Sequence, residues 1–528
     1  MFRIEYLKLK DHPQLGNLEL FLSEKNEIKN ISKPYTSIII GANGTGKSYI
    51  LKTVADIFRQ FKAYSETEKK EFNLPFDVHV RYVIHHNSYE IVTKKLDESK
   101  GSKKREYLFF KNRPIEKDFY DGKTNKIVVT GFEVLHKELE YPEKLLVNSV
   151  IPTDRFVYKN TSQGDFYQYL GVRSTSSTTS TKSSSRRIIK HLFNASSANK
   201  QFTQTLKELL HFLEFEESLN VHYSTKINKL FFSGKLKIED FKQYFENWWD
   251  VNFGFSNRKK ENPLWSVPYY KNHFKGNESA TERIVEYLNQ IANEPERLKH
   301  KANSVAKIIS VDLFDKNTSE LDLEMIRHLE NLDILSLDGI KIKKSNSLLS
   351  INDVSSGEYH LLISLIGIFA NISNNSLVLI DEPEISLHPN WQMRYMSFLK
   401  NVFKNYSSCQ FVITTHSHFL VSDLEDESSS VTALKREVGT NRILAFLLDE
   451  DTFGRSAEEI LYNVFNVKTV RNHFIEADLT DLLGLISENS KEKKQIQKLL
   501  DTIKSINISP NDPLNAVIEE ANAYLKTI

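Results

Sequence analysis

The 528-residue sequence is poor in cysteine, in net charge and in long apolar runs. One cysteine excludes an intramolecular disulfide and a CxxC metal site, and the apolar surroundings of Cys409 (CQFVIT) predict a buried strand thiol. Lys+Arg number 70 and Asp+Glu 69, so contact with nucleic acid would require a local patch. No apolar run approaches the roughly 18 residues of a membrane span, and the start MFRIEYLKLK does not read as a signal peptide. We therefore expect a cytoplasmic protein without membrane contact.

The order of strand and helix patterns predicts a head domain interrupted by an insertion. At about 150 residues per domain, the length allows two to four domains. Alternating strands, a loop and a helix open the chain, so residues 1–187 are expected to form the N-terminal part of an α/β head. The serine-rich stretch RSTSSTTSTKSSSRR at 173–187 predicts a loop outside any core.

Helical periodicity dominates the next part of the chain, and residues 188–340 are therefore expected to be a helical insertion. Strands and helices alternate again over 341–450, which predicts the C-terminal part of the head. Residues 451–528 are expected to be a helical region that binds a partner. The predicted fold class is α/β, with two helical additions.

A glycine-rich segment between a strand and a helix, GANGTGKS at 41–48, fits the pattern G-x-x-x-x-G-K-[ST] of a phosphate-binding loop. Glycines let backbone N–H groups surround phosphates, the lysine reaches the β- and γ-phosphates, and the serine hydroxyl can bind Mg²⁺. The residues expected to bind nucleotide here are Gly41, Asn43, Gly44, Gly46, Lys47 and Ser48.

An acidic pair follows the apolar run 377–380, the pattern of a buried parallel strand that ends at the edge of a sheet. Asp381 is expected to hold Mg²⁺, and Glu382 to activate the attacking water as general base. Taken alone, such a pair is more often an ordinary strand end, but the upstream phosphate-binding loop favours the catalytic interpretation.

The segment SSGE at 355–358 has two interpretations that do not exclude each other. S-x-x-E before an apolar run is a helix capping box, with Ser355 as the cap. The same capped N-terminus, with Ser356 and Gly357 exposed, could contact a γ-phosphate held by a second subunit. His416, two residues after the strand FVIT, is either a hydrogen-bonded core histidine or a polar sensor of that phosphate.

These elements occur in the order found in ABC-type ATPases of the SMC, recombination-repair and OLD branch, which this sequence resembles over about 1–60 and 345–420. The resemblance implies ATP and Mg²⁺ as ligands, and paired heads in a homodimer or higher oligomer. It makes Ser355, Ser356 and Gly357 a signature motif, Glu382 the catalytic base and His416 the switch histidine. The signature reads VSSGE and no Q-loop glutamine is evident, with Asp154 the nearest candidate, so hydrolysis is expected to be slow or regulatory.

The stretch DEPEISLHPNWQ at 381–392 resembles more narrowly the ATPase subunit of Septu-type antiphage defence systems, as do YQYLGVR at 167–173 and TFGRSAEEIL at 452–461. The residues Leu387 to Pro389 would then lie in the D-loop region at the dimer interface. The resemblance implies a separate HNH nuclease subunit as partner. Some such systems are encoded beside retrons, which adds a reverse transcriptase and its RNA or DNA as partners.

Three other functions remain open from the sequence, and one of them is an ATP-gated scaffold with no hydrolysis of consequence. An OLD-like nuclease would need TOPRIM metal ligands, and only Asp449-Glu450-Asp451 comes close, so we expect no nuclease activity in this chain. A DNA repair or recombination ATPase would act directly on DNA. The basic groups that could then meet phosphates are Lys103-Lys104-Arg105, Arg186-Arg187 and Arg258-Lys259-Lys260, although such groups are more often solvated faces.

Overall fold

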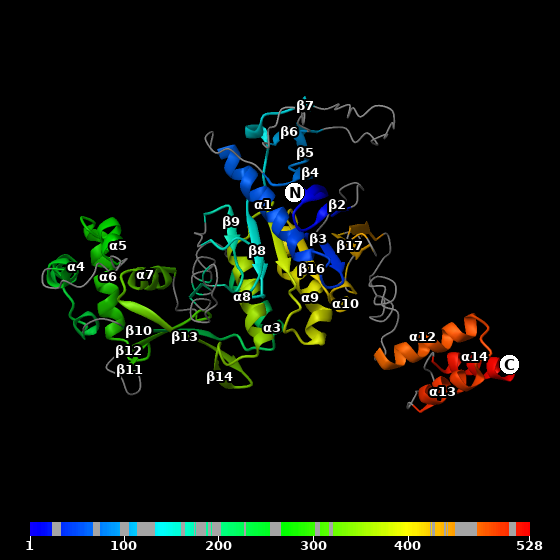
Figure 1. Cartoon of the computed structure of the whole chain (residues 1–528). Coiled ribbons are helices and arrows are strands. Elements are labelled where there is room, and N and C mark those ends of the chain that lie inside the picture. Colours follow the sequence, from blue (N-terminus) through cyan, green and yellow to red (C-terminus); the bar gives the residue numbers. More distant parts are fainter. Residues whose placement is uncertain are drawn as a thin grey trace. The chain divides into compact units, whose positions relative to one another are not determined.

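The computed structural model divides into two compact units, Met1–Gly454 and Arg455–Ile528, which are described separately (Figure 1). The residues that the structure describes are 1–23, 33–66, 74–94, 105–112, 132–159, 164–173, 175, 186–187, 189, 192, 202–225, 229–253, 266–300, 307–315, 320–422, 424, 428–437, 440, 442–448, 473–505 and 514–527.

The first unit is built on a seven-stranded sheet. Its order is β18 (Ile443–Leu447), β17 (Ser429–Arg436), β3 (Tyr35–Gly41), β16 (Gln410–Thr415), β15 (Leu377–Asp381), β8 (Leu145–Ser149) and β9 (Tyr167–Tyr169). All neighbours pair in parallel except β17 and β18. The inner strands β15 and β16 are buried along their whole length because both faces of the sheet are covered. The parallel strands therefore end together at one edge, where α/β proteins bind ligands.

Helices cover the two faces of this sheet. Helix α1 (Lys47–Glu66) packs on the face that carries Val147, Leu379 and Val412. The residues between these positions point the other way, toward helices α8 (Ser356–Asn371) and α9 (Pro389–Val402). Contacts on that face include the bond from Ser364 Oγ to Asn148 Oδ1 and the ring contact of Phe403 with Phe411. A short helix α10 (His418–Val421) follows β16.

A second, antiparallel sheet extends the same core and explains the strand patterns of the first 140 residues. Its order is β2 (Gly16–Phe21), β1 (Phe2–His12), β4 (Asp77–Ile84), β5 (Asn87–Lys94), β6 (Glu106–Lys111) and β7 (Phe132–Glu133). Its apolar residues share one core with α1: Phe2, Tyr82 and Phe58 have their ring centroids within 5.8 Å of one another.

The stretch 188–340 contains both helices and strands, so the prediction of a wholly helical insertion was wrong. Helices α3 (Phe202–Phe212), α4 (Ile238–Phe253), α5 (Ser266–His273), α6 (Glu278–Ala292) and α7 (Glu320–Asn331) alternate with β10 (Leu219–Thr225), β11 (Leu298–His300), β12 (Lys307–Asp312) and β13 (Leu335–Lys344). With β14 (Ser347–Ser350) these strands form an antiparallel sheet in the order β11-β12-β10-β13-β14. The helical periodicity of the neighbouring segments hid these strands.

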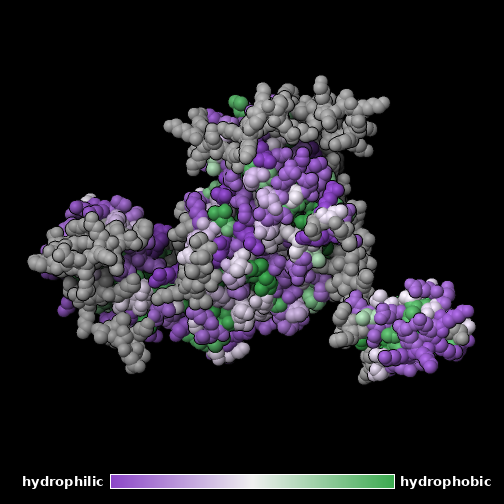
Figure 2. All heavy atoms as spheres, in the orientation of Figure 1, coloured by the Kyte–Doolittle hydropathy of each residue, from purple (hydrophilic) through white to green (hydrophobic). Residues whose placement is uncertain are grey.

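In the part of the second unit that the structure describes, three helices form a bundle: α12 (His473–Ser487), α13 (Lys493–Lys504) and α14 (Leu514–Thr527). Its small core of buried residues includes Leu482, Leu500 and Leu525. No described helix of either unit is both long and apolar enough to span a bilayer. On the face seen in Figure 2 the surface of the first unit is mainly hydrophilic, with small separate hydrophobic patches.

Candidate active site

The predicted phosphate-binding loop lies between the end of β3 and the start of α1. Gly44 and Gly46 adopt φ of 79° and 87°, a region that side chains rarely enter. A Cβ on Gly41 would lie 2.8 Å from the backbone oxygen of Leu434, so this glycine is needed for close approach to β17. Asn43 and Gly44 are exposed at the tip of the loop. The loop is thus shaped by its glycines and open to solvent.

Lys47 is the charged centre of the site. Its side chain is buried, and Nζ donates hydrogen bonds to the backbone oxygens of Gly41 at 3.0 Å and Ala42 at 3.5 Å. Burial lowers the pKa of Lys47, whereas the nearby carboxylates of Glu382, Glu384 and Asp381 act to raise it. The ammonium group therefore lies within its own loop, close to three acidic side chains.

Ser48 and Asp381, the two residues that the sequence predicts to bind magnesium, meet at the end of β15. The Ser48 hydroxyl donates to Oδ1 of Asp381 at 3.0 Å, and the Thr414 hydroxyl donates to the same oxygen at 2.6 Å. Burial raises the pKa of Asp381, and these two hydrogen bonds oppose the shift. A hydroxyl and a carboxylate beside a phosphate-binding loop are the hard oxygen donors that Mg²⁺ prefers, so the residues fit this ion.

Glu382 and His416 come together from the ends of β15 and β16. Glu382 has a φ of 48°, unusual for a residue with a side chain. Its Oε1 atom lies 3.2 Å from Nε2 of His416, and Nε2 lies 2.6 Å from Nζ of Lys47. The hydrogen bond with His416 lowers the pKa of Glu382, which keeps the carboxyl group ionised. The arrangement places an ionised carboxylate beside Lys47.

Glu384 also belongs to the site, although sequence reasoning gave it no role. Its Oε1 accepts a hydrogen bond from the backbone N–H of His416 at 2.7 Å, and burial raises the pKa of its carboxyl group. A second link joins α9 to the segment after β16, where the Ser417 hydroxyl donates to Oε1 of Gln392 at 2.6 Å. The signal in the sequence was the second glutamate of DEPE, which follows Glu382 after one proline.

The segment SSGE forms the capping box that the sequence predicted. Ser355 accepts a hydrogen bond from the backbone N–H of Glu358, and Oε2 of Glu358 accepts one from the backbone N–H of Ser355 at 2.8 Å. Lys344 holds the other carboxylate oxygen of Glu358 at 2.6 Å. Ser355 and Ser356 are exposed, and within the part of the chain that the structure describes neither serine is hydrogen-bonded to residues 41–48.

Gly357, which was expected to be exposed, is buried and packs against the turn that follows β15. A Cβ at this position would lie well under 3.0 Å from the backbone oxygen of Ser386. Ser386 and His388 are exposed on the same turn, whereas Leu387 is buried. The start of α8 and this turn therefore form one continuous segment of surface.

Both carboxylate oxygens of Asp154, the candidate for the Q-loop position, accept hydrogen bonds from other side chains of the protein. Arg173 donates to Oδ1 at 2.7 Å and to Oδ2 at 2.9 Å, and the Tyr169 hydroxyl donates to Oδ2 at 2.6 Å. Both partners belong to the run YQYLGVR. Asp154 is buried and anchors this run to the loop after β8.

Several other predicted features lie outside the described residues. They are Lys103, Lys104, Arg258-Lys259-Lys260, Asp449-Glu450-Asp451 and the run 452–461. Of the remaining basic residues, Arg105 pairs with Asp77 at 2.6 Å, and Arg187 donates to the backbone oxygen of Gly171 at 2.8 Å. Among the described residues, no three His, Cys, Asp or Glu side chains gather as a metal site. Cys409 is fully buried, as expected, and burial raises its pKa to about 12.

The sequence matches one protein family and is similar to two retron ATPases. The sequence model of the AAA_15 family, described as an AAA ATPase domain, matches residues 8–421. The retron Vc95 probable ATPase of Vibrio cholerae serotype O1 biovar El Tor is 30% identical over 191 residues, which cover 30% of this chain and 35% of that protein. The retron Ec83 probable ATPase of Escherichia coli is 27% identical over 172 residues, covering 30% of this chain and 29% of that protein. The chain thus spans about a third of the length of the curated relatives it matches.

Among solved structures, the chain is similar to the Smc head domain of Pyrococcus furiosus bound to the C-terminal domain of ScpA. The identity is 12%, the TM-score 0.33, and the match covers 88% of this chain and 100% of that chain. The SMC head domain of Thermotoga maritima matches with 12% identity and a TM-score of 0.33 over 85% of this chain and 100% of that chain.

Proposed function

Because the chain belongs to the AAA_15 family of AAA ATPase domains, we propose that it binds ATP with Mg²⁺ at residues 41–48 and hydrolyses it to ADP and phosphate. The observation that carries this proposal is the contact of Lys47 and Glu382 with His416. These residues come from three segments that lie far apart in the sequence. Packing of the core does not explain why a lysine, a carboxylate and a histidine lie together at the edge of a sheet.

Each side chain has a defined task in this reaction. Lys47 and the backbone N–H groups of the loop bind the β- and γ-phosphates, while Ser48 and Asp381 hold Mg²⁺, which neutralises phosphate charge. Glu382 orients the attacking water and takes its proton, because it is an ionised carboxylate beside the lysine. His416 senses the γ-phosphate from the end of β16. Glu384 fixes the backbone of His416 and acts as a positioning residue.

We further propose that two heads pair across ATP. The support is the exposed surface formed by Ser355, Ser356 and the turn at Ser386, which the chain does not direct at its own phosphate-binding loop. A helix N-terminus with exposed hydroxyl groups is suited to a phosphate that another subunit presents. A C2 dimer would then contain two identical composite sites.

The partner that this ATPase controls is proposed to be a separate HNH-type nuclease, with a retron reverse transcriptase and its nucleic acid as further partners. The names of the two retron ATPases that match the chain support the retron association. The nuclease is proposed from the resemblance of DEPEISLHPNWQ to Septu-type ATPases. Nucleotide-dependent pairing of the heads would restrain or release this nuclease. ATP that binds the paired heads more tightly than the separate heads raises the fraction of paired heads.

Phosphate release by the purified chain with ATP and Mg²⁺ tests the ATPase proposal, and its absence would contradict it. DNA cleavage tests the partner proposal. The chain alone should not cleave DNA with Mg²⁺ or Mn²⁺, whereas the complex with its nuclease should, in a manner that depends on ATP. Cleavage by the chain alone, lost in Asp449→Ala or Asp451→Ala, would instead support the OLD-like nuclease.

A further inference from the structure

The side chain of Lys344, at the end of β13, forms an ion pair with the start of α8. Its Nζ atom lies 2.6 Å from Oε1 of Glu358, the third residue of that helix. Only 8% of the Glu358 side chain and 31% of the Lys344 side chain are exposed, so solvent screens this pair less than a surface ion pair. No step of the proposed reaction uses Lys344.

Glu358 connects Lys344 to Ser355. While Oε1 pairs with Lys344, Oε2 accepts hydrogen bonds from both the backbone N–H and the hydroxyl group of Ser355, each at 2.8 Å. Burial acts to raise the pKa of Glu358, but the bonds from Lys344 and Ser355 outweigh it and lower the pKa. The carboxylate is thus held at both oxygens, and it fixes the orientation of the cap residue that precedes the exposed Ser356.

Lys344 is itself held by the residues that follow α3. Its ammonium group lies 5.1 Å from the ring centroid of the buried Phe215. The backbone N–H of Glu216 donates to the backbone oxygen of Lys343 at 2.9 Å, and the Glu216 carboxylate accepts from the backbone N–H of Asn346 at 2.8 Å. The end of β13 is therefore bonded to the chain that follows α3, near the start of the inserted stretch.

Helix α3 contacts the helix on the other side of the exposed surface described above. The ring of Phe212, its last residue, stacks on Phe398 of α9 with a centroid distance of 3.8 Å and an interplanar angle of 11°. Helix α9 begins shortly after the turn at Ser386, and α8 begins at Ser356. The inserted stretch thus contacts both helices that border the surface proposed to face a second head.

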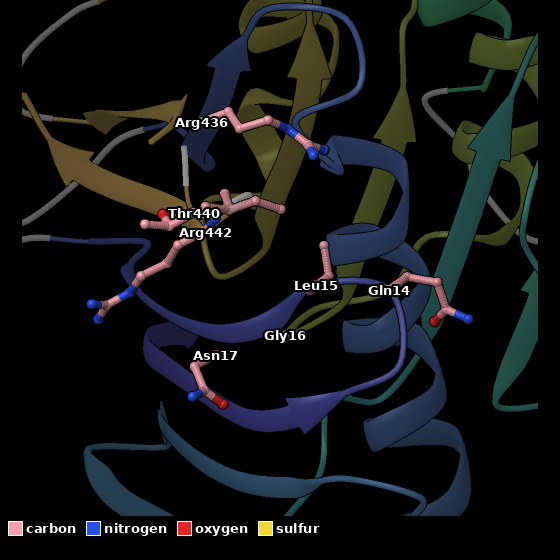
Figure 3. A pocket seen from close by; sticks show the side chains of 8 residues that line it. Gln14, Leu15, Gly16, Asn17, Arg436, Thr440 and Arg442 are labelled. Atoms are coloured by element: carbon pink, nitrogen blue, oxygen red, sulfur yellow. Dashed lines mark hydrogen bonds between the residues drawn. The ribbon is translucent and has the colours of Figure 1, made fainter. Parts of the chain in front are cut away.

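Arg436 offers a comparison, because it contacts the phosphate-binding loop of its own head. Its guanidinium, in the pocket shown in Figure 3, donates to the backbone oxygen of Gly44 at 2.6 Å. Within the described residues, the contacts of the Lys344 ammonium lie at the start of α8 and after α3, and not in this loop. A change of Lys344 is therefore expected to leave the loop of its own chain intact and to act through Glu358.

We propose that Lys344 is a positioning residue of the composite ATP site, where through Glu358 it holds Ser355 and Ser356 in the orientation that meets the γ-phosphate bound by a second head. This inference rests on the pairing of heads proposed above. Loss of the ammonium leaves a buried carboxylate without its charged partner, so the carboxylate must turn toward water or take up a proton. Either change releases Ser355. The defect should therefore appear in the ATP site of the partner head, which makes the inserted stretch a part of that site.

The test is the ATPase activity of Lys344 variants and of their mixtures. Lys344→Met keeps the length of the side chain and removes the ammonium, and it should lower turnover by about 10- to 100-fold, the range of one lost charge-assisted hydrogen bond. Lys344→Arg retains a cation and should keep most of the activity. Lys343→Ala is the matched control, because it removes the neighbouring cation, which pairs with Glu216 at 2.7 Å, and it should turn over ATP at the normal rate. Thermal unfolding shows whether each variant is folded.

Mixing distinguishes an effect on the partner head from an effect on the same head. Lys344→Met mixed with Lys47→Ala should recover activity, to about a quarter of normal for random pairing, because one composite site carries both changes and the other carries neither. Mixed with Ser356→Arg, whose bulky side chain blocks the contact with the γ-phosphate, it should recover none, because both sites of the mixed dimer are then defective. A variant that is only less stable would show no difference between the two mixtures.

The outcomes separate this inference from the proposed pairing of heads. Recovery with Ser356→Arg and none with Lys47→Ala would overturn the inference, because it would place Lys344 in the ATP site of its own head. Normal turnover by Lys344→Met would also overturn it. If Lys47→Ala and Ser356→Arg recover no activity when mixed with each other, the pairing of heads itself is wrong and the inference fails with it.

Discussion

Nζ of Lys47 lies 2.6 Å from Nε2 of His416, so two groups assigned to the γ-phosphate contact each other within one head. The same nitrogen also lies 3.2 Å from Oε1 of Glu382, so one imidazole nitrogen contacts both the lysine and the carboxylate. Phosphates that attract Lys47 would withdraw it from His416, so we expect nucleotide binding to change the contact between His416 and Glu382.

Replacement of Lys47 by alanine should abolish ATP binding, because the phosphates lose their buried ammonium partner. A single charge-assisted hydrogen bond is worth roughly 1.5–3 kcal/mol, and Lys47 is proposed to make more than one. Calorimetric titration measures the effect. Lys52→Ala, one turn further along α1 in a pair with Asp56, is the control and should bind ATP normally. Unchanged affinity of Lys47→Ala for ATP would show that residues 41–48 do not bind the phosphates.

The exchange Glu382→Gln should preserve ATP binding and reduce turnover by about 10²- to 10⁴-fold, since the amide has a similar shape but cannot accept the proton of water. Phosphate release and nucleotide titration are measured on the same sample. Glu133→Gln, an exposed carboxyl group in β7, should leave both quantities unchanged. Turnover at the normal rate in Glu382→Gln would show that another group is the base.

Gly357→Ala should destabilise the head by about 1–3 kcal/mol, because its methyl group would collide with the backbone oxygen of Ser386. Gly367→Ala in the same helix is the matched control. Its Cβ would meet only Leu170 at ordinary contact distances of 3.7–3.9 Å, and alanine favours a helix interior by roughly 0.5–1 kcal/mol. Thermal unfolding should therefore shift down in the first variant and stay level or rise in the second. Equal shifts would contradict the packing of α8 on this turn.

The stability of the first unit should fall as the pH drops from 7 to 5, in part because of His12. Burial lowers the pKa of His12 from 6.5 to about 4, so the folded state binds fewer protons than the unfolded state between these values. Stability is then complete above pH 6.5 and is lost toward pH 4, by at most about 2 kcal/mol between pH 7 and pH 5.

Thermal unfolding at both pH values, for the unaltered chain and for His12→Gln, isolates the contribution of this residue. The variant should be less stable at pH 7, and its stability should change less between the two pH values. An identical pH dependence in both proteins would rule out the neutral His12 that the hydrogen bonds to Gln14 and Leu15 require.

The sequence was sufficient for features that depend on neighbouring residues. The loop 41–48, the acidic pair after β15 and the capping box at Ser355 each combine a short pattern with a strand or helix that the pattern itself predicts. Local patterns did not predict that Lys47, Glu382 and His416 lie together, because their proximity depends on the order of the parallel strands. Only the resemblance to ABC-type ATPases implied it.

Other contacts had no local signal. Arg436 reaches Gly44 across 392 positions in sequence, and Gly357 approaches Ser386 because of how α8 packs on the turn after β15. The strands between 188 and 340 were missed for a related reason. Their pairing partners lie up to 123 residues away, as for Leu219 and Ile342. The periodicity of a single segment cannot predict a strand partner at that distance.

The central claim is that Lys47 of one head and Ser356 of another act on the same ATP, and mixing two inactive variants tests it most directly. Lys47→Ala and Ser356→Arg should each lack ATPase activity. In a mixed dimer one composite site carries both changes and the other carries neither, so activity should return, to about a quarter of normal for random pairing in a symmetric dimer. A mixture that remains inactive, although both variants are folded and associate with each other, would contradict the account.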